Sequence, residues 1–370
     1  MRNDKPKSIW QVVLTDILSG ALILGLVVFF QLGLPILQAR SGSHAAPREP
    51  DLPIPPAAAS PQLETEAADP SQDLVISGEM ETEEGESASV EVGAEPTPEP
   101  TPDLRTEWQI RFAEHFTEEV VVTEHSYTSP QVSITVETRE FGEGAGKSVY
   151  HVADIYVASL DNFRTYTANN ELAYWSTQDA MQMDADSHAI LAISGDFYSY
   201  QPKGFLVRNG VLYMSDQTHC DLCVLYNSGV MACYGRNDYT VEDIWSRGVA
   251  QAWNFGPSLL DENGKVKPSY ELSTAVSYPN PRSAVGYYEP GHYVFVVVDG
   301  RQDGYSRGMT IPELASVFRD LGCKVAYNLD GGGSALMTFL HERYSSQSNL
   351  ADRELGDMLI VTETGWEEKR

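Results

Sequence analysis

The sequence predicts a strand-rich α/β protein of the mixed α+β kind, in which one globular domain with few helices follows an N-terminal transmembrane helix and a disordered linker. Three observations support this organisation. Residues 17–37 are almost entirely apolar. Residues 38–103 are dominated by proline, acidic and small residues, and residues 104–370 hold many short β-branched runs separated by turn residues.

The apolar segment 17–37 is 21 residues long and is interrupted only by small residues, one glutamine and one proline. A helix of this length rises about 31 Å, which matches the ~30 Å hydrocarbon core of a bilayer. Three basic residues precede it, so the positive-inside rule places residues 1–16 in the cytoplasm. Since the apolar regions of signal peptides are shorter, about 7–15 residues, an uncleaved anchor is favoured over a cleaved signal. We therefore expect a single-pass protein of the cell membrane whose C-terminal domain is extracytoplasmic.

Residues 38–103 form the predicted linker. The stretch from Ser41 to Asp103 holds 11 of the chain's 21 prolines, 15 acidic residues against one basic residue, and no aromatic residue. Such a composition cannot bury enough apolar surface to offset the entropy lost on ordering. A solvated tether is therefore predicted, with a peptide-docking role for the prolines as the alternative.

The charge and the cysteine count exclude several classes of protein. The chain has 53 Asp+Glu against 25 Lys+Arg, a net charge of -28. Because phosphate backbones need a basic surface, nucleic acid is not expected as a partner. Four cysteines in 370 residues are too few for a disulfide scaffold. The remaining class is an acidic globular domain held at a membrane through residues 17–37.

Short β-branched runs bounded by turn residues predict the strands of the domain. Four of these runs are residues 131–137, 149–157, 188–194 and 293–298. Two hairpins are predicted in addition, one in residues 206–213 around Asn209-Gly210, which is the strongest short turn signal, and one in residues 222–234.

Helices are fewer. The best-defined one spans residues 310–322, where Thr310 and Glu313 form a capping box and a glycine provides the stop. Its apolar residues recur on one face at helical spacing. Shorter helices are predicted in residues 176–183 and 240–246.

The cysteines allow three interpretations. His219, Cys220, Cys223 and Cys233 include a C-x2-C pair of the zinc-binding type, but a structural zinc site usually has a second ligand pair. If the hairpin in residues 222–234 is symmetric, Cys223 and Cys233 lie opposite each other, within disulfide reach. A disulfide, two free buried thiols and a zinc site stay open as alternatives. The sequence requires no metal and no cofactor.

Polar residues follow several of the predicted strands. Asp299 and Asp330 each end an apolar run, so both are expected at one edge of a sheet. Two carboxylates are the minimum for glycoside cleavage, one as acid and one as base or nucleophile. Backbone N–H groups of Gly331–Gly333 could cradle a phosphoryl oxygen, and Arg282 and Arg301 could each fork onto phosphate oxygens. Each feature alone is also typical of an ordinary turn or a surface ion pair.

Six motifs occur along the chain in a fixed order. They are Gly195-Asp-Phe-Tyr198, Phe255-Gly-Pro-Ser258, Asn280-Pro-Arg-Ser-Ala-Val-Gly286, Val298-Asp-Gly-Arg301, Gly308-Met-Thr-Ile-Pro-Glu-Leu-Ala315 and Asn328-Leu-Asp-Gly-Gly-Gly-Ser334. Together they resemble the phosphodiester glycosidase family. The resemblance covers roughly residues 150–362, and the last motif is its most specific part.

The resemblance implies hydrolysis of a sugar–phosphate diester, which releases the sugar and leaves a phosphomonoester. By motif match, the implied catalytic residues are Asp299, Asp330 and Asp196. The implied substrate-binding residues are Arg282, Arg301, Gly331, Gly332, Gly333, Ser334 and Tyr198. One departure is visible at Asp196, which follows Ser194-Gly195 where the family often has Asn-Gly before the aromatic pair.

The predicted function is therefore a membrane-anchored, extracytoplasmic phosphodiester glycosidase that hydrolyses sugar-1-phosphate diester links in a surface or secreted glycan. One alternative is a binding module that recognises a phosphate-bearing envelope polysaccharide without cleaving it. A second is an assembly factor of the envelope, for which the tether alone would suffice. The presence of both Asp299 and Asp330 favours the enzyme, because a phosphate-binding module needs fewer carboxylates near its ligand.

Overall fold

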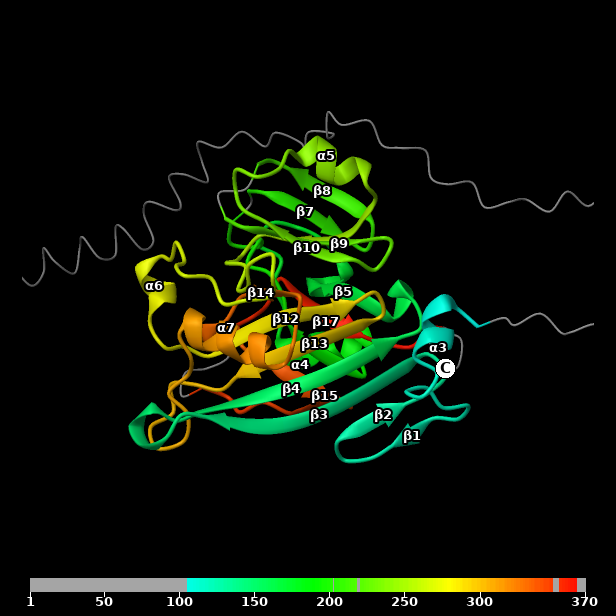
Figure 1. The fold of residues 1–370 in the computed structure, drawn as a ribbon, viewed down its shortest axis with the longest axis horizontal. Coiled ribbons are helices and arrows are strands. Elements are labelled where there is room, and N and C mark those ends of the chain that lie inside the picture. Colours follow the sequence, from blue (N-terminus) through cyan, green and yellow to red (C-terminus); the bar gives the residue numbers. More distant parts are fainter. Residues whose placement is uncertain (1–104, 202, 218–219, 349–352, 365–370) are drawn as a thin grey trace, which may run out of the picture. The chain divides into compact units, whose positions relative to one another are not determined.

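The computed structural model describes residues 105–201, 203–217, 220–348 and 353–364, all of which lie within one unit, Ile54–Arg370. The predicted cytoplasmic segment, transmembrane helix and linker, residues 1–103, lie outside the described residues. Within the described part, no helix combines the length and the apolar character that a membrane crossing requires. Helices and strands carry the labels of Figure 1.

Three antiparallel sheets form most of the described structure (Figure 1). In spatial order, the seven-stranded sheet consists of β1 (Val121–Val122), β2 (Ser126–Thr128), β3 (Val132–Phe141), β4 (Ser148–Val157), β13 (His292–Val298), β12 (Arg282–Glu289) and β14 (Val325–Asn328). The first five-stranded sheet consists of β10 (Met231–Tyr234), β9 (Leu222–Tyr226), β11 (Val249–Trp253), β7 (Phe205–Arg208) and β8 (Val211–Ser215). The second consists of β16 (Glu342–Arg343), β15 (Met337–Phe339), β6 (Leu191–Ser194), β17 (Asp357–Val361) and β5 (Phe163–Thr167).

Five α-helices accompany these sheets within the described residues: α3 (Glu107–Arg111), α4 (Ala180–Ser187), α5 (Val241–Ser246), α6 (Thr274–Ser277) and α7 (Ile311–Asp320). Short 3-10 turns occur as well, among them Gly332–Ser334. The fold is thus strand-rich, has few helices and forms a single mixed domain, as the sequence predicts.

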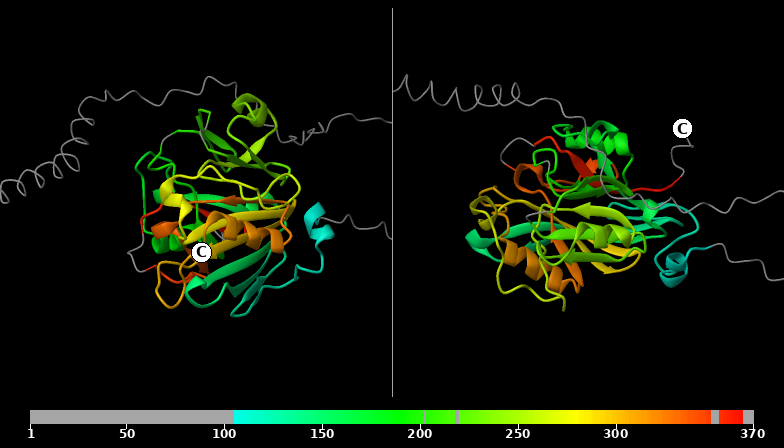
Figure 2. Two further views of the ribbon diagram at one scale, coloured as in Figure 1. Left: turned by 60° about the vertical axis from the view of Figure 1, so that its left-hand side comes forward. Right: turned by 90° about the horizontal axis from the view of Figure 1, so that it is seen from above.

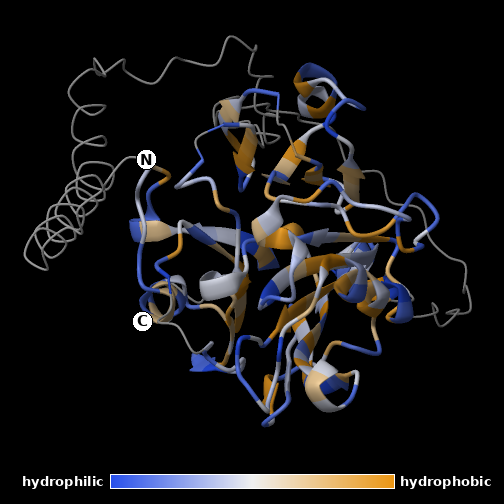
Figure 3. Cartoon of the chain, turned by 90° about the vertical axis from the view of Figure 1, so that its left-hand side faces the viewer, coloured by the Kyte–Doolittle hydropathy of each residue, from blue (hydrophilic) through white to orange (hydrophobic). Residues whose placement is uncertain are grey.

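The central strands of the seven-stranded sheet, β12 and β13, are buried on both faces. Along β13, Phe295 and Val297 point into the larger core, which the sheet shares with strands of both five-stranded sheets. The alternate residues Val294 and Val296 point the other way, into a second core that is closed by α7. This two-sided burial explains why β13 is a continuous apolar run instead of an alternating one. Figures 1 and 2 show α7 lying along β12 and β13, and in Figure 3 the apolar residues gather on the strands.

A third, smaller core lies under α4. Met183 of this helix packs with Ala192 of β6 and with Met358 and Ile360 of β17. The opposite face of β6 contributes Leu191 and Ile193 to the larger core. The second five-stranded sheet is therefore also covered on both faces, and its strand ends are held rigidly.

Most of the local predictions are confirmed. The hairpin of β7 and β8 turns at Asn209-Gly210, and the hairpin of β9 and β10 pairs Cys223 with Cys233. Thr310 and Glu313 form the expected capping box of α7, and α5 begins directly after Thr240.

One helix is displaced from its predicted position in residues 176–183. The helix α4 begins at Ala180, because Asp179 caps it by accepting hydrogen bonds from the N–H groups of Met181 and Gln182. The hydroxyl of Ser176, where the prediction begins, donates to the carbonyl of Ala168 instead.

Strand direction brings three chain segments to one edge of the seven-stranded sheet. Strand β12 begins at this edge, and its antiparallel neighbours β13 and β14 both end there. The register pairs Arg282 with Val298 and Ala284 with Asn328, so the residues that follow Val298 and Asn328 emerge beside the first residue of β12. This edge carries the polar motifs of the sequence.

Candidate active site

As expected, the backbone places Asp299 and Asp330 at the same edge of the seven-stranded sheet. Asp299 follows β13 directly, and Asp330 lies two residues beyond the end of β14. The N–H of Leu329 donates to the carbonyl of Ser283 at 2.8 Å, which continues the β12–β14 ladder up to the turn. Both aspartates therefore leave the same sheet edge, on either side of the start of β12.

Asp196 comes to the same place from the second five-stranded sheet. It follows Ser194 and Gly195 at the end of β6. The N–H of Asp330 donates to the carbonyl of Gly195 at 2.9 Å, and the hydroxyl of Ser194 donates to the carbonyl of Asp330 at 3.1 Å. The hydroxyls of Ser194 and Ser283 lie 2.6 Å apart and join the two sheets. The sequence-predicted residues Asp196 and Asp330 thus belong to one site.

The carboxylate of Asp196 is held from three sides. Its Oδ1 accepts the N–H of Phe197 at 2.8 Å, and its Oδ2 accepts the N–H of Asn254 at 2.8 Å. The guanidinium of Arg208 lies 3.4 Å from the same Oδ2. These three contacts fix the orientation of a carboxylate that is itself almost fully buried.

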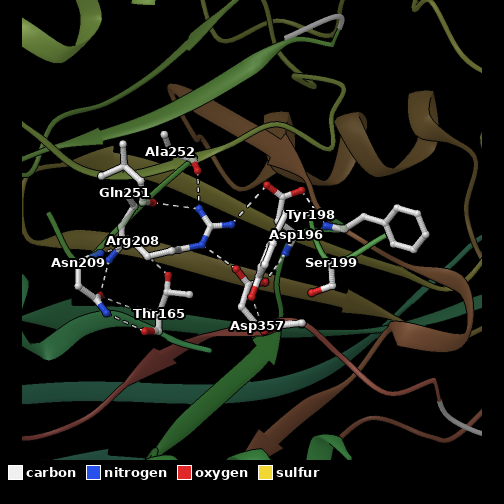
Figure 4. Close-up of polar contacts among 12 residues, drawn as sticks. Thr165, Asp196, Tyr198, Ser199, Arg208, Asn209, Gln251, Ala252 and Asp357 are labelled. Atoms are coloured by element: carbon white, nitrogen blue, oxygen red, sulfur yellow. Dashed lines mark hydrogen bonds and ion pairs between the residues drawn. The ribbon is translucent and has the colours of Figure 1, made fainter. Parts of the chain in front are cut away.

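Arg208 links Asp196 to a second buried carboxylate (Figure 4). Its Nε donates to Oδ2 of Asp357 at 2.6 Å, and Oδ1 of Asp357 accepts the N–H of Asp196 at 2.7 Å. Nη1 of Arg208 donates to the backbone carbonyls of Val207 and Ala252. The side chain of Arg208 is only 1% exposed. We call Asp196, Arg208 and Asp357 the Arg208 network.

The charged groups of the Arg208 network shift one another's pKa values. Burial raises the pKa of Asp357 to about 6, and Arg208 opposes this rise. Burial lowers the pKa of Arg208, but Asp357 and Asp196 outweigh it, and the net shift is upward. The arginine therefore stays charged and neutralises one of the two carboxylates that it bridges.

Sequence reasoning missed Arg208 and Asp357, although each carries a signal. Arg208 ends the apolar strand β7, and Asp357 begins the apolar strand β17, so both are charged residues next to buried runs. The third missed residue of this region is Arg353.

Arg353 is the cation that faces Asp330. Its Nη1 lies 3.4 Å from Oδ2 of Asp330, and its guanidinium lies over the ring of Phe197, 5.5 Å from the centroid. Burial raises the pKa of Asp330 to about 6, a rise that Ser334 and Arg353 oppose and that Asp196 reinforces. The side chain of Arg353 is 41% exposed, so this part of the site is open to solvent.

The glycine loop Gly331–Gly333 lies against the loop that precedes β12. A Cβ on Gly331 would lie 2.6 Å from the carbonyl oxygen of Pro281, and one on Gly332 would lie 3.0 Å from Nη2 of Arg301. Gly332 also has a φ of +64°, a conformation that favours glycine. Its N–H donates to the carbonyl of Pro281 at 2.9 Å and therefore already has a partner within the protein.

Arg301 lies directly above this loop. Its own φ is +60°, a strained value for a residue with a side chain, and its Nη2 donates to Oδ1 of Asn280 at 2.8 Å. Strain of this kind persists only where the surrounding contacts enforce it. Arg301 is thus held at the edge that carries Asp330.

Arg282 has a different environment from the one expected for a phosphate ligand. Its Nε donates to the carbonyl of Met309 at 2.9 Å, and its Nη2 donates to the carbonyls of Val276 and Tyr278. Burial, together with the nearby Arg301, lowers the pKa of Arg282 to about 10. Arg282 thus joins two segments to the start of β12, the α6 segment with Val276 and Tyr278, and the segment with Met309.

Asp299 belongs to a separate polar group. Its Oδ2 lies 2.9 Å from Nε2 of His151 and accepts the hydroxyl of Tyr305 at 2.9 Å, while its Oδ1 accepts the N–H of Ser346 at 2.9 Å. Nδ1 of His151 lies 3.0 Å from Oγ1 of Thr138. Asp299 is only 2% exposed. We call this set the Asp299 group. Sequence reasoning missed His151, which lies inside the predicted strand of residues 149–157.

Tyr198 lies beneath the Arg208 network. Its hydroxyl donates to the carbonyl of Gly356 at 2.8 Å, and its ring centroid lies 5.6 Å from the guanidinium carbon of Arg208. Burial raises the pKa of Tyr198. The side chain is buried, so Tyr198 supports the network from below.

The described residues contain no group of three or more His, Cys, Asp or Glu side chains that could hold a metal ion. Cys223 and Cys233 face each other across the β9–β10 hairpin, as the sequence predicts, and both are free thiols here. His219, the fourth residue of the zinc interpretation, lies outside the described residues. The described site presents carboxylates, arginines and backbone groups.

Comparisons with known proteins agree with the motifs. Residues 187–362 match the family model described as phosphodiester glycosidase. The SPbeta prophage-derived uncharacterized protein YomE of Bacillus subtilis (strain 168) is 26% identical over 191 residues, which are 50% of this chain. The matched segment spans only 30% of the length of that relative.

Among solved structures, one shares the fold and a second has a lower score. The catalytic domain of zebrafish N-acetylglucosamine-1-phosphodiester alpha-N-acetylglucosaminidase, auto-inhibited by its pro-peptide, superposes with a TM-score of 0.52 at 19% identity and covers 66% of this chain and 88% of that one. A hypothetical protein from Synechocystis has a TM-score of 0.49 at 14% identity, with 63% of this chain and 62% of that chain covered.

The matched region contains Asp196, Arg208, Asp330 and Asp357, which are the residues that the geometry brings together. It begins just before β6 and ends just after β17. The family match and the site therefore rest on the same part of the chain, residues 187–362, which are similar to the phosphodiester glycosidase family.

Proposed function

We propose that this chain is a membrane-anchored, extracytoplasmic phosphodiester glycosidase, which hydrolyses sugar-1-phosphate diester links in a surface or secreted glycan. The observation that carries the proposal is the backbone hydrogen bond from Asp330 to Gly195, which holds the carboxylate-bearing ends of two sheets side by side within the family-matched region. A site with two carboxylates and two nearby arginines suits a substrate that has both an anomeric carbon and a phosphate.

The reaction breaks the bond between the anomeric carbon and the phosphate oxygen. Positive charge develops at the anomeric carbon, and a carboxylate beside it lowers the barrier. The bond's electron pair leaves with the phosphate, and water supplies a hydroxyl to the carbon. We assign the proton of that water to Asp330, because a base with a pKa of about 6 is ionised at neutral pH and still basic enough to accept it.

The other groups of the site then have supporting roles. We assign Asp196, which is fixed by Asn254, Phe197 and Arg208, to the sugar side of the site. Arg353 and Arg301 lie beside Asp330 and the glycine loop, where they can neutralise the phosphate. These are the two arginines to which we assign phosphate binding.

Asp299 and Arg282 act on the reaction through their neighbours. Three contacts hold the Asp299 carboxylate, and three carbonyls accept hydrogen bonds from Nε and Nη2 of Arg282. Both residues lie at the sheet edge that positions Asp330. We therefore propose that they fix the geometry of the edge.

Membrane anchoring is the second part of the proposal. It rests on the apolar segment 17–37 and on the basic residues before it. Protease added to intact cells should release a soluble acidic fragment that contains the domain. A domain that stays fully protected from the protease would contradict the proposed orientation.

The decisive experiment incubates the purified full chain with a panel of sugar-1-phosphate diesters that differ in the sugar and in the alcohol. Release of free sugar together with a phosphomonoester supports the enzyme. The alternative, a binding module, predicts saturable binding of the same diesters without any release. Loss of turnover in Asp330→Asn, with the melting temperature unchanged, would connect the activity to this site.

A further inference from the structure

A cleft of about 750 Å³ opens next to the site. Phe255 forms part of its wall, and the ring of Phe255 lies edge-to-face against the ring of Phe197, with centroids 6.2 Å apart. Phe197 in turn donates its N–H to Asp196 and lies under Arg353. The carbonyls of Gly256 and Pro257, which also line the cleft, accept hydrogen bonds from Asn328, two residues before Asp330. The wall of the cleft therefore adjoins the Asp196 side of the site.

The lining of the cleft has the chemistry of a sugar-binding surface. Two aromatic residues, Phe255 and Tyr270, stand among hydroxyl, amide and carboxylate side chains. Aromatic faces pack against the apolar faces of sugar rings, and the polar groups can exchange hydrogen bonds with sugar hydroxyls. A volume of this size is within the range of sites that hold a ligand larger than a single sugar.

The charges in the cleft favour a neutral ligand. Each basic side chain is already paired, Lys267 with Asp221 at 3.2 Å and Arg236 with Glu271 at 2.9 Å. The hydroxyl of Ser258 also donates to Asp221 at 2.7 Å, which ties the first pair to the wall. Asp238 adds a third acid to the lining. A second phosphate would meet more acids than bases here, whereas sugar hydroxyls would meet suitable acceptors.

From these observations we propose that the cleft binds neutral saccharide units that continue from the sugar whose anomeric phosphate is cleaved. The substrate is then the phosphodiester of an oligosaccharide or polysaccharide, and the chain extends on the sugar side of the broken bond. This inference rests on the proposed function, because it takes the Asp196 side of the site as the side that holds the sugar.

The test compares diesters of increasing length on the full chain. One series carries one, two or three neutral hexose units on the sugar side of a methyl phosphodiester, built on the hexose that the panel identifies. The second series keeps one hexose and lengthens the alcohol instead. We expect kcat/KM to rise at least about tenfold from one to three hexose units, because remote binding energy is used at the reacting centre. No comparable rise is expected in the second series.

A bulky substitution makes the test specific to the cleft. Ser269 is exposed in its lining, so Ser269→Trp adds volume there without deleting a buried contact. This variant should lose most of the gain with length. The matched control is Ser246→Trp, an exposed serine at the end of α5 and outside the cleft, which should keep the gain.

The outcomes separate the two proposals. Cleavage that does not depend on length, or a gain that Ser269→Trp retains, overturns the cleft proposal and leaves the glycosidase standing. If no diester of any length is cleaved, the proposed function fails. In that case, calorimetric titration with maltotriose, cellotriose and chitotriose still decides the question of the cleft. Binding that Ser269→Trp abolishes supports it, and no binding of any of the three contradicts it.

Discussion

Asp330 and Asp299 leave the same edge of the seven-stranded sheet, each after an apolar strand and each before a glycine, yet their surroundings differ. The carboxylate of Asp299 accepts hydrogen bonds from Tyr305 and Ser346 and lies within hydrogen-bond distance of His151. The residue is almost fully buried. Asp330 contacts Ser334, the backbone of Gly331 and the half-exposed Arg353, and burial raises its pKa to about 6.

The difference distinguishes an aspartate that holds the sheet edge in position from one that can take part in the reaction. Three contacts hold the Asp299 carboxylate in one orientation. A carboxylate with a raised pKa that lies beside a half-exposed arginine keeps the capacity to take up a proton. Two aspartates that look equivalent in the sequence are thus expected to contribute very differently to turnover.

The largest expected effect is the loss of activity in Asp330→Asn. Removing the base should lower kcat/KM by at least ~10²-fold with little change in melting temperature, because the amide is nearly isosteric. Asp299→Asn should cost only about tenfold, the equivalent of ~1.4 kcal/mol, through misplacement of the sheet edge. The measurement is kcat/KM on the best diester of the panel, with thermal melting in parallel.

A buried aspartate outside the site provides the control for this comparison. Asp184 is bonded to Thr338 and His341, so Asp184→Asn perturbs a similar environment away from the chemistry. Its kcat/KM should stay near that of the unmodified chain. If Asp299→Asn proved as damaging as Asp330→Asn while folded, the distinction between the two aspartates would be wrong.

The next largest effect concerns stability in the Arg208 network. Arg208→Met leaves Asp196 and Asp357 buried without their cation, and should lower the free energy of unfolding by about 3–5 kcal/mol at neutral pH. The pKa of Asp357 is already raised to about 6, so a proton can replace the missing cation in acid. The destabilisation should therefore be smaller at pH 5 than at pH 8, as measured by urea unfolding at both pH values.

Arg208→Lys tests whether the effect depends on charge or on shape. Lysine keeps the charge but cannot reach both carboxylates and the two carbonyls at once. Partial recovery of stability is expected. A Met variant whose loss of stability does not depend on pH would rule out the role of the arginine as a counter-charge.

A smaller effect is expected on the pH dependence of turnover. In the unmodified chain kcat/KM should rise as pH increases through about 6, since the proposed base must lose its proton. Arg353 lowers the pKa of Asp330, so Arg353→Gln should move the midpoint of this rise to higher pH. Arg319→Gln removes a surface arginine of similar exposure and should leave the midpoint unchanged. A midpoint that stays fixed in Arg353→Gln would show that another group controls the rise.

Local signals made much of the fold predictable. The Asn209-Gly210 turn and the Thr310–Glu313 capping box act over a few residues, and both elements form where the sequence places them. The helix α4 starts at Ala180, four residues later than predicted. The structure uses Asp179 as the cap, and Ser176 is engaged by the carbonyl of Ala168.

The site was predictable only in part, because its geometry depends on distant contacts. Strand-end aspartates can be recognised locally, and Asp196 and Asp330 do meet. The pairing of Arg208 with Asp357 joins residues 149 positions apart and follows from how two sheets pack. Arg282 is the opposite case, because the sequence identified the residue but not its surroundings. It has the right type for a phosphate ligand, but its Nε and Nη2 donate to the backbone carbonyls of Met309, Val276 and Tyr278.

The hairpin of β9 and β10 gives the smallest and most local prediction. Symmetry about its turn places Cys223 opposite Cys233, and the structure has this register. Burial is the main cause that raises the pKa of Cys223 well above its usual value, and a contact with Cys233 adds to it, so the thiol resists oxidation at neutral pH. In an extracytoplasmic domain, an external oxidant such as a thiol–disulfide exchange enzyme would be needed to form the bond.

We expect non-reduced peptide mapping of chain purified without oxidant to show both thiols free, with a Cys223–Cys233 link forming after treatment with oxidised glutathione. Cys220 is exposed and Cys323 is buried elsewhere, so a link from either of them to Cys223 would contradict the observed register.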